Sequence, residues 1–280
     1  MKFFNELWKP FLNKEKILIF LTIFVLLNIN IFISYQDSLV SDPSYLQEVP
    51  SAGLTFFYDL FCIGTNPFLF MLLMLLLPNI MSYDFLNYQQ SHFSYLIETR
   101  IKKNTYYKNI FIKNIIMTFC IILLIQILIL ITIHIFYAPL QFNTTIFPEH
   151  YYAKTQILAS HEVVSLLIYL FVTSVGYALI SSLIFSLQIL ISNKYIYRCF
   201  GVIFGILLVL IPALAQGYLP SPDFAFVFQI NNLVALGMEN VRANPFGFSH
   251  LILYIVSFGL YSLISFGAYQ GLLFWRASYD

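Results

Sequence analysis

Six long stretches of this chain consist almost wholly of apolar residues and carry no charge in their interior. A helix needs about 20 apolar residues to cross the hydrocarbon core of a bilayer, and each stretch is long enough. The pattern therefore predicts an all-α membrane protein with six transmembrane helices in one domain, residues 1–280. The predicted spans are residues 17–36, 64–87, 112–137, 163–192, 199–217 and 249–275.

The composition favours the same class. Hydrophobic residues make up 60% of the chain and charged residues 10%, whereas an average soluble domain has about 25% charged residues. A soluble fold of this size has too little interior for so many apolar side chains. The net charge of +1 gives no reason to expect a nucleic-acid partner, and three scattered cysteines favour neither a disulfide framework nor a metal site. The abundance of isoleucine, phenylalanine, asparagine, lysine and tyrosine is typical of an AT-rich genome, which favours a bacterial cell membrane as the location.

Basic residues are distributed unevenly between the two sides of the predicted bundle. Of the 14 lysines and arginines, twelve fall in the terminal segments and alternate loops, and only Lys154 and Arg242 fall in the opposite loops. Basic residues are enriched on the cytoplasmic side of a membrane. We therefore expect both termini and the segment 84–113 to be cytoplasmic.

Two short segments have amphipathic patterns of their own. Residues 1–16 combine aromatic side chains with four lysines, which predicts a helix lying in the membrane interface. A cleaved signal peptide is the alternative, but no small-residue cleavage site follows the next apolar stretch. Residues 92–104 have the spacing of a second short helix with one apolar face. That face consists of Phe93, Leu96, Ile97 and Ile101.

The last outer loop, residues 217–248, is unusually apolar and contains three prolines. Proline interrupts helices, and irregular backbone occurs at membrane depth only where protein or a water-filled cavity surrounds it. Two interpretations have equal weight: a segment that re-enters the membrane, and a surface loop that packs on the spans.

The sequence lacks the patterns of common enzyme sites. His161-Glu162 begins like a zinc-binding helix, but Ser165 stands where a second histidine is required. Neither a Gly-x-Ser-x-Gly nor a Gly-x-x-x-x-Gly-Lys-Ser/Thr sequence occurs. The spans carry no ionisable acid or base at depth, which argues against an ion-coupled carrier. We therefore expect no catalytic, cofactor-binding or metal-binding residues in this chain.

A few polar side chains fall within the predicted spans. They are candidates to line a translocation path, or they form hydrogen bonds between helices, and we favour the second interpretation. These residues are Asn79, Gln126, His134 and Gln188.

Small residues spaced by four mark candidate packing or dimer faces in the last three spans. Lipid provides no hydrophobic drive for helices to associate, so close contact depends on small side chains. At any one of these faces, packing within the subunit is favoured over dimerisation. The faces contain Ser174, Ala178 and Ser182, then Gly201 and Gly205, and finally Gly267 and Gly271.

The order of features along the chain resembles that of permease subunits of ABC exporters of the ABC-2 type. An interfacial helix, a span and an outer loop precede a second span that ends Leu-Leu-Pro. An acid (Asp84), the short helix, the turn Thr99–Lys103 and the sequence Tyr106-Tyr107-Lys108 then lead into the third span. The topology matches over the whole chain.

In that family the loop between the second and third spans is a cytoplasmic coupling helix that docks on a separate ATP-binding subunit. The resemblance implies that residues 92–104 are this helix, and that ATP and Mg are bound by two copies of a partner ATPase rather than by this chain. It also implies a second permease subunit, in a homo- or heterodimer, and an amphipathic or hydrophobic substrate such as a bacteriocin peptide, a lipid or a drug. The implied contacts with the ATPase are Asp84, His92, Phe93, Leu96, Ile97, Glu98, Arg100, Ile101, Lys102 and Lys103.

A membrane protein without transport activity is the alternative. In that hypothesis the chain is a sensor or scaffold that recruits a soluble partner through residues 92–104. The two hypotheses differ in the partner, because only the exporter requires a nucleotide-binding subunit.

Overall fold

The computed structural model of the chain describes residues 14–41, 52–90, 103–142, 158–159, 161–189, 191, 193–218, 222–236, 246–247 and 249–278. Every regular element in these ranges is helical. Six helices are long and apolar enough to cross a membrane, as the sequence predicts. These helices indicate a multi-pass membrane protein.

The long helices follow the predicted spans with shifted ends. They are α2 (Lys14–Ser41), α5 (Pro67–Ile80) followed by α6 (Ser82–Gln90), α8 (Lys103–Phe136), α9 (Glu162–Ser186), α10 (Lys194–Tyr218) and α13 (His250–Ser278). α2 begins within the predicted interfacial helix, and α8 begins within the predicted coupling helix. The remainder of those two predictions, residues 1–13 and 92–102, lies outside the described residues.

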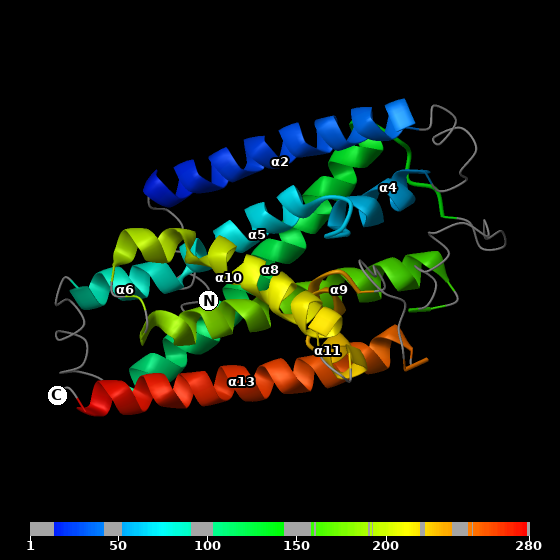
Figure 1. Cartoon of the computed structure of the whole chain (residues 1–280). Coiled ribbons are helices and arrows are strands. Elements are labelled where there is room, and N and C mark those ends of the chain that lie inside the picture. The colour runs from blue at the N-terminus through cyan, green and yellow to red at the C-terminus, as the bar shows by residue number, and fades with distance from the viewer. Residues whose placement is uncertain are drawn as a thin grey trace.

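Two of the long segments form the centre of the bundle. In the apolar part of the second span 78% of residues are buried, and in α9 61% are buried, against 22% in α2, 17% in α10 and 22% in α13. In Figure 1, α2 and α13 run along opposite edges of the bundle, with the other long helices between them. The outer helices therefore present most of their apolar surface to the surroundings, as lipid-facing helices do.

Polar side chains join α8 to α9 within this bundle. The Asn114 amide donates a hydrogen bond to Ser181 Oγ at 2.9 Å, and the Gln126 amide donates to Thr173 Oγ1 at 2.8 Å. Ser174 in turn donates to Gln126 Oε1 at 3.3 Å. Because lipid cannot satisfy these groups, hydrogen bonds between helices both stabilise the pair and fix its register.

Shorter helices fill the connections between the spans. They are α4 (Ala52–Phe61), the 3₁₀ turn η3 (Leu187–Ile189), α11 (Pro222–Val227) and α12 (Asn231–Val234). α4 is only ten residues long, too short to span, yet nearly all of it is buried. The sequence prediction included none of these four elements.

The described part of residues 217–248 folds back into the bundle. α12 packs against the middle of α9, where a β-carbon at Gly176 would overlap the carbonyl oxygen of Leu233. Asn232 donates to the Phe226 carbonyl at 2.8 Å and to Ser257 Oγ at 3.2 Å. The irregular backbone of this segment is thus packed against protein, and whether it re-enters the membrane stays a prediction.

Candidate functional site at the basic end of the bundle

The second span is interrupted at Met81, between α5 and α6. Pro78, in the last turn of α5, has no N–H to offer the carbonyl of Met74 four residues earlier. α10 approaches α5 closely here, and a β-carbon at Gly201 would overlap that carbonyl oxygen. Proline and glycine together therefore allow two backbones to touch beside the break.

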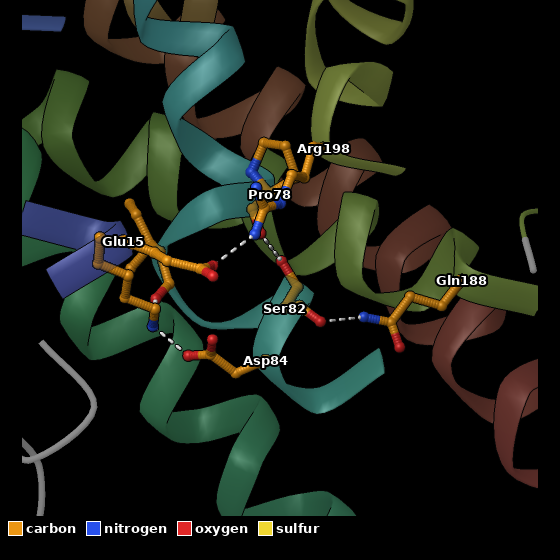
Figure 2. A network of polar contacts seen from close by, with 8 residues as sticks. Glu15, Pro78, Ser82, Asp84, Gln188 and Arg198 are labelled. Carbon is orange, nitrogen blue, oxygen red and sulfur yellow. Dashed lines mark hydrogen bonds and ion pairs between the residues drawn. The ribbon is translucent and has the colours of Figure 1, made fainter. Parts of the chain in front are cut away.

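Amide and hydroxyl side chains satisfy the backbone around the break. The Asn79 amide donates to the Arg198 carbonyl of α10 at 3.1 Å, and Ser82 Oγ donates to the Pro78 carbonyl at 3.2 Å. The Gln188 amide reaches across from η3 and donates to the Ser82 carbonyl at 2.8 Å. Figure 2 shows Ser82 between Pro78 and Gln188. A helix broken inside a membrane requires such partners, because lipid provides none.

A buried tyrosine completes this part of the network. The Tyr197 hydroxyl donates to the Ile184 carbonyl at 3.1 Å and accepts from the Gln188 amide at 3.2 Å. The Tyr197 side chain is fully buried. It therefore fixes the start of α10 against the end of α9.

A buried ion pair joins α2 to α6. Lys16 Nζ contacts Asp84 Oδ2 and also donates to the Ile80 carbonyl at 2.8 Å. The two charged side chains are only 5% and 17% exposed. A buried charge is tolerated when it is paired and hydrogen-bonded, and removing one partner of such a pair leaves the other uncompensated.

Arg198 makes a second, more exposed set of contacts at the same end. Its guanidinium lies 3.1 Å from Glu15 Oε2 and 3.9 Å from the centre of the Tyr83 ring. Figure 2 shows Arg198 and Glu15 facing each other above the break. An exposed ion pair contributes little energy, but stacking on an aromatic ring adds orientation. The start of α10 is thereby attached to both α2 and α6.

Charge separates the two ends of the bundle. All lysines and arginines that the structure describes lie near the end that holds the network, whereas the acids furthest from it are Asp37, Asp59, Glu162 and Asp223. Within the described ranges, no group of three or more His, Cys, Asp or Glu side chains could hold a metal ion. The chemistry of the network is that of holding helices together around a break.

Most residues predicted to contact an ATPase lie outside the part of the chain that is described. Asp84 is described and belongs to the ion pair. Lys103 is the first residue of α8, and only its backbone is described. Those outside are His92, Phe93, Leu96, Ile97, Glu98, Arg100, Ile101 and Lys102. Their role stays a prediction.

The four polar residues predicted within the spans all make hydrogen bonds. Gln126 bonds Thr173, and Asn79 and Gln188 belong to the network at the break. His134 is exposed near the end of α8, where its Nδ1 accepts from the Leu140 amide at 3.0 Å. A translocation role for these residues stays a prediction.

The small-residue faces differ in what they touch. Ser174, Ala178 and Ser182 are buried within the subunit. Gly201 and Gly205 lie against α5, whereas a β-carbon at Gly267 or Gly271 would meet nothing within 4 Å. Gly267 and Gly271 therefore lie on a face of α13 that packs against no other part of the described chain.

Sequence reasoning missed the residues that complete the network: Glu15, Lys16, Ser82, Tyr197 and Arg198. A signal for the break was present, because a Pro-Asn sequence near the end of a span is followed by a run of polar residues. The pairing of Lys16 with Asp84 had no such signal, since 68 residues separate the two. No known protein family, curated protein or solved structure matches the chain.

Proposed function

We propose that this chain is the membrane-spanning subunit of an ATP-driven exporter of the ABC-2 kind. Two copies of a separate subunit bind and hydrolyse ATP with Mg, and a second membrane subunit completes the translocation path. The observation that carries the proposal is the polar network that ties α6 to α2, η3 and α10. It lies at the end of the bundle from which residues 91–102 depart.

A soluble motor moves membrane helices only through a segment that is firmly attached to them. Residues 91–102 are preceded by α6 and followed by α8, so each end continues into a spanning segment. The Lys16–Asp84 pair and the hydrogen bond from Gln188 to the Ser82 carbonyl anchor α6 sideways as well. A force applied to residues 91–102 is therefore passed to several helices at once.

The distribution of charge supports a cytoplasmic location for this end, because basic residues are enriched on that side. An ATP-binding subunit requires that location. The predicted apolar face of residues 92–104 would bury against the motor, as an amphipathic helix does in a groove. The apolar interior of the bundle supports an amphipathic or hydrophobic substrate, such as a peptide, a lipid or a drug.

The test is to purify the tagged chain from its source cells in mild detergent with its bound partners. We expect wild type to retain a protein with a Gly-x-x-x-x-Gly-Lys-Ser/Thr sequence and Mg-dependent ATP hydrolysis. Ile97→Asp places a charge on the apolar face and is expected to reduce the retained ATPase by about tenfold or more, the loss that truncating a central contact produces.

The matched control is Tyr95→Asp, which adds the same charge on the opposite face of the predicted helix and is expected to retain the ATPase. If Ile97→Asp and Tyr95→Asp retain it equally, the coupling role is wrong. If wild type instead retains only a soluble protein without a nucleotide-binding motif, the chain is a sensor or scaffold and the exporter proposal fails.

A further inference from the structure

An apolar groove of about 520 Å³ runs between α8, α9 and α13. Aromatic side chains from all three helices line it: Phe111 and Phe119 of α8, Phe171 of α9, and Phe258 and Phe266 of α13. Its volume falls within the range of about 300–1,000 Å³ that is usual for small-molecule sites. No charged side chain lines it.

Small residues of α9 make the room for this groove. Ala178 and Ser182 line it, so the part of α9 between α8 and α13 presents short side chains to the groove. Two of the serine hydroxyls that line it are hydrogen-bonded, because Ser182 Oγ and Ser265 Oγ lie 2.7 Å apart and Ser182 also donates to the Leu179 carbonyl at 2.7 Å. The groove thus offers an apolar surface to its occupant.

The groove opens sideways rather than toward either end of the bundle. Ile116, Phe171 and Phe266, one from each helix, line it and are 39%, 58% and 60% exposed. At the basic end Phe111 closes it against Tyr269, with ring centres 4.5 Å apart. All lining residues belong to helices that are apolar and long enough to span, so the opening faces hydrocarbon.

A basic residue of α8, Lys108, lies on the helix face that lines the groove, toward the basic end of the bundle. Lys108 precedes Phe111 by three residues and Ile115 by seven, and helix geometry places all three on one face. Lys108 is exposed and takes no part in the Lys16–Asp84 or Arg198–Glu15 ion pair. A lysine at this depth meets lipid headgroups, and such basic positions attract anionic ones.

We infer that this groove binds one acyl chain of an anionic phospholipid, whose phosphate pairs with Lys108. The apolar lining excludes a charged occupant from the groove itself, and the lateral opening admits a chain directly from the bilayer. The exposed Lys108 selects the charge of the headgroup. The lipid belongs to the leaflet at the basic end of the bundle, and the site does not depend on any transport activity.

A second groove provides an internal comparison. It has a volume of about 460 Å³, is lined by α10, α11 and α13 among others, and is equally apolar. The cation nearest to it on α10, Arg198, already contacts Glu15 and the Tyr83 ring. The other described basic residue of α10, Lys194, lies over the Tyr195 ring at 5.5 Å. This groove is therefore expected to admit acyl chains without regard to the headgroup.

The test uses the whole chain in lipid nanodiscs that contain trace phosphatidylglycerol or phosphatidylcholine with the same diazirine-bearing acyl chain. After photolysis, labelled peptides are quantified by mass spectrometry. We expect residues 111–119 and 258–266 to be labelled about fivefold more by phosphatidylglycerol, the effect of one lysine at an anionic surface. The second groove, sampled by residues 204–215, is expected to show equal labelling by the two lipids.

Two variants complete the test. Lys108→Gln is expected to abolish the headgroup preference, and Ser262→Phe, which fills the groove, to reduce labelling by both lipids. Leu263→Phe, on the exposed face of α13, is the matched control and is expected to leave labelling unchanged. Equal labelling by the two lipids in wild type, or a preference that survives Lys108→Gln, would overturn the inference. Lys108→Gln decides the question even if Ser262→Phe fails to fold, because Lys108 is exposed.

Discussion

At the basic end of the bundle, charged, amide and hydroxyl side chains join the helices around the break, whereas at the opposite end aromatic rings pack α4 against α9. Phe57, Tyr58 and Phe61 of α4 surround Tyr169 of α9, with Tyr58 and Tyr169 stacked edge to face at 4.9 Å. Burial, together with the nearby carboxylate of Glu162, raises the pKa of the Tyr58 hydroxyl.

The difference follows from the backbone at each end. The basic end contains the break at Met81, where backbone carbonyl groups require directed partners. Ser82 and Gln188 provide them for the Pro78 and Ser82 carbonyls, and Asn79 donates to the Arg198 carbonyl of α10. At the opposite end α4 is a regular helix, so packing alone can hold it. Directional hydrogen bonds define the geometry at the break, whereas burial of aromatic rings holds α4.

Breaking the ion pair tests this comparison with the largest expected effect. Asp84→Ala leaves Lys16 buried without its counter-charge, which is expected to lower the free energy of unfolding by about 3–5 kcal/mol. The double variant Lys16→Met with Asp84→Leu removes both charges and is expected to cost far less. Thermal unfolding of the purified variants in one detergent measures both.

The single variant Lys16→Met completes the double-mutant cycle. It leaves Asp84 unpaired and is expected to be destabilising like Asp84→Ala. If the double variant costs as much as the two single variants together, the charges do not interact favourably, and the ion pair does not hold α2 to α6.

The six spans were predictable because length and hydropathy alone determine which segments lipid can accommodate. α4 was not, since its ten residues are too few for a span and its burial depends on which rings reach it. The polar network was not predictable either. Asn79 and Gln188 could be singled out as polar residues in apolar surroundings, but their partners are a carbonyl of α10 and a carbonyl of α6, which only the tertiary fold brings near.

Two glycines test the steric side of the comparison. Gly201→Val puts side-chain atoms into the Met74 carbonyl beside the break, and overpacking of this kind is expected to cost about 1–3 kcal/mol. Gly267→Val, in the corresponding pair on α13, meets open space and is expected to change stability by less than about 0.5 kcal/mol. The same unfolding assay compares the two.

Cross-linking in membranes adds a second measurement to the Gly267 variant. If Gly267→Val lowers the yield of cross-linked dimers without changing monomer stability, the exposed face of α13 contacts another copy of the chain. If Gly201→Val is as well tolerated as Gly267→Val, the close approach of α10 to α5 is not needed at the basic end.

Two tyrosines give the smallest and most closely matched test. Tyr197 and Tyr169 are both fully buried in α10 and α9, but only Tyr197 Oη has hydrogen-bond partners, the Ile184 carbonyl and the Gln188 amide, whereas Tyr169 Oη has none. Tyr197→Phe is expected to lower the free energy of unfolding by about 1 kcal/mol, the net contribution of such a hydrogen bond. Tyr169→Phe keeps the ring, removes an unsatisfied hydroxyl and is expected to be neutral or slightly stabilising. If the order is reversed, directed polar contacts do not distinguish the two ends, and the anchoring assigned to the basic end loses its physical basis.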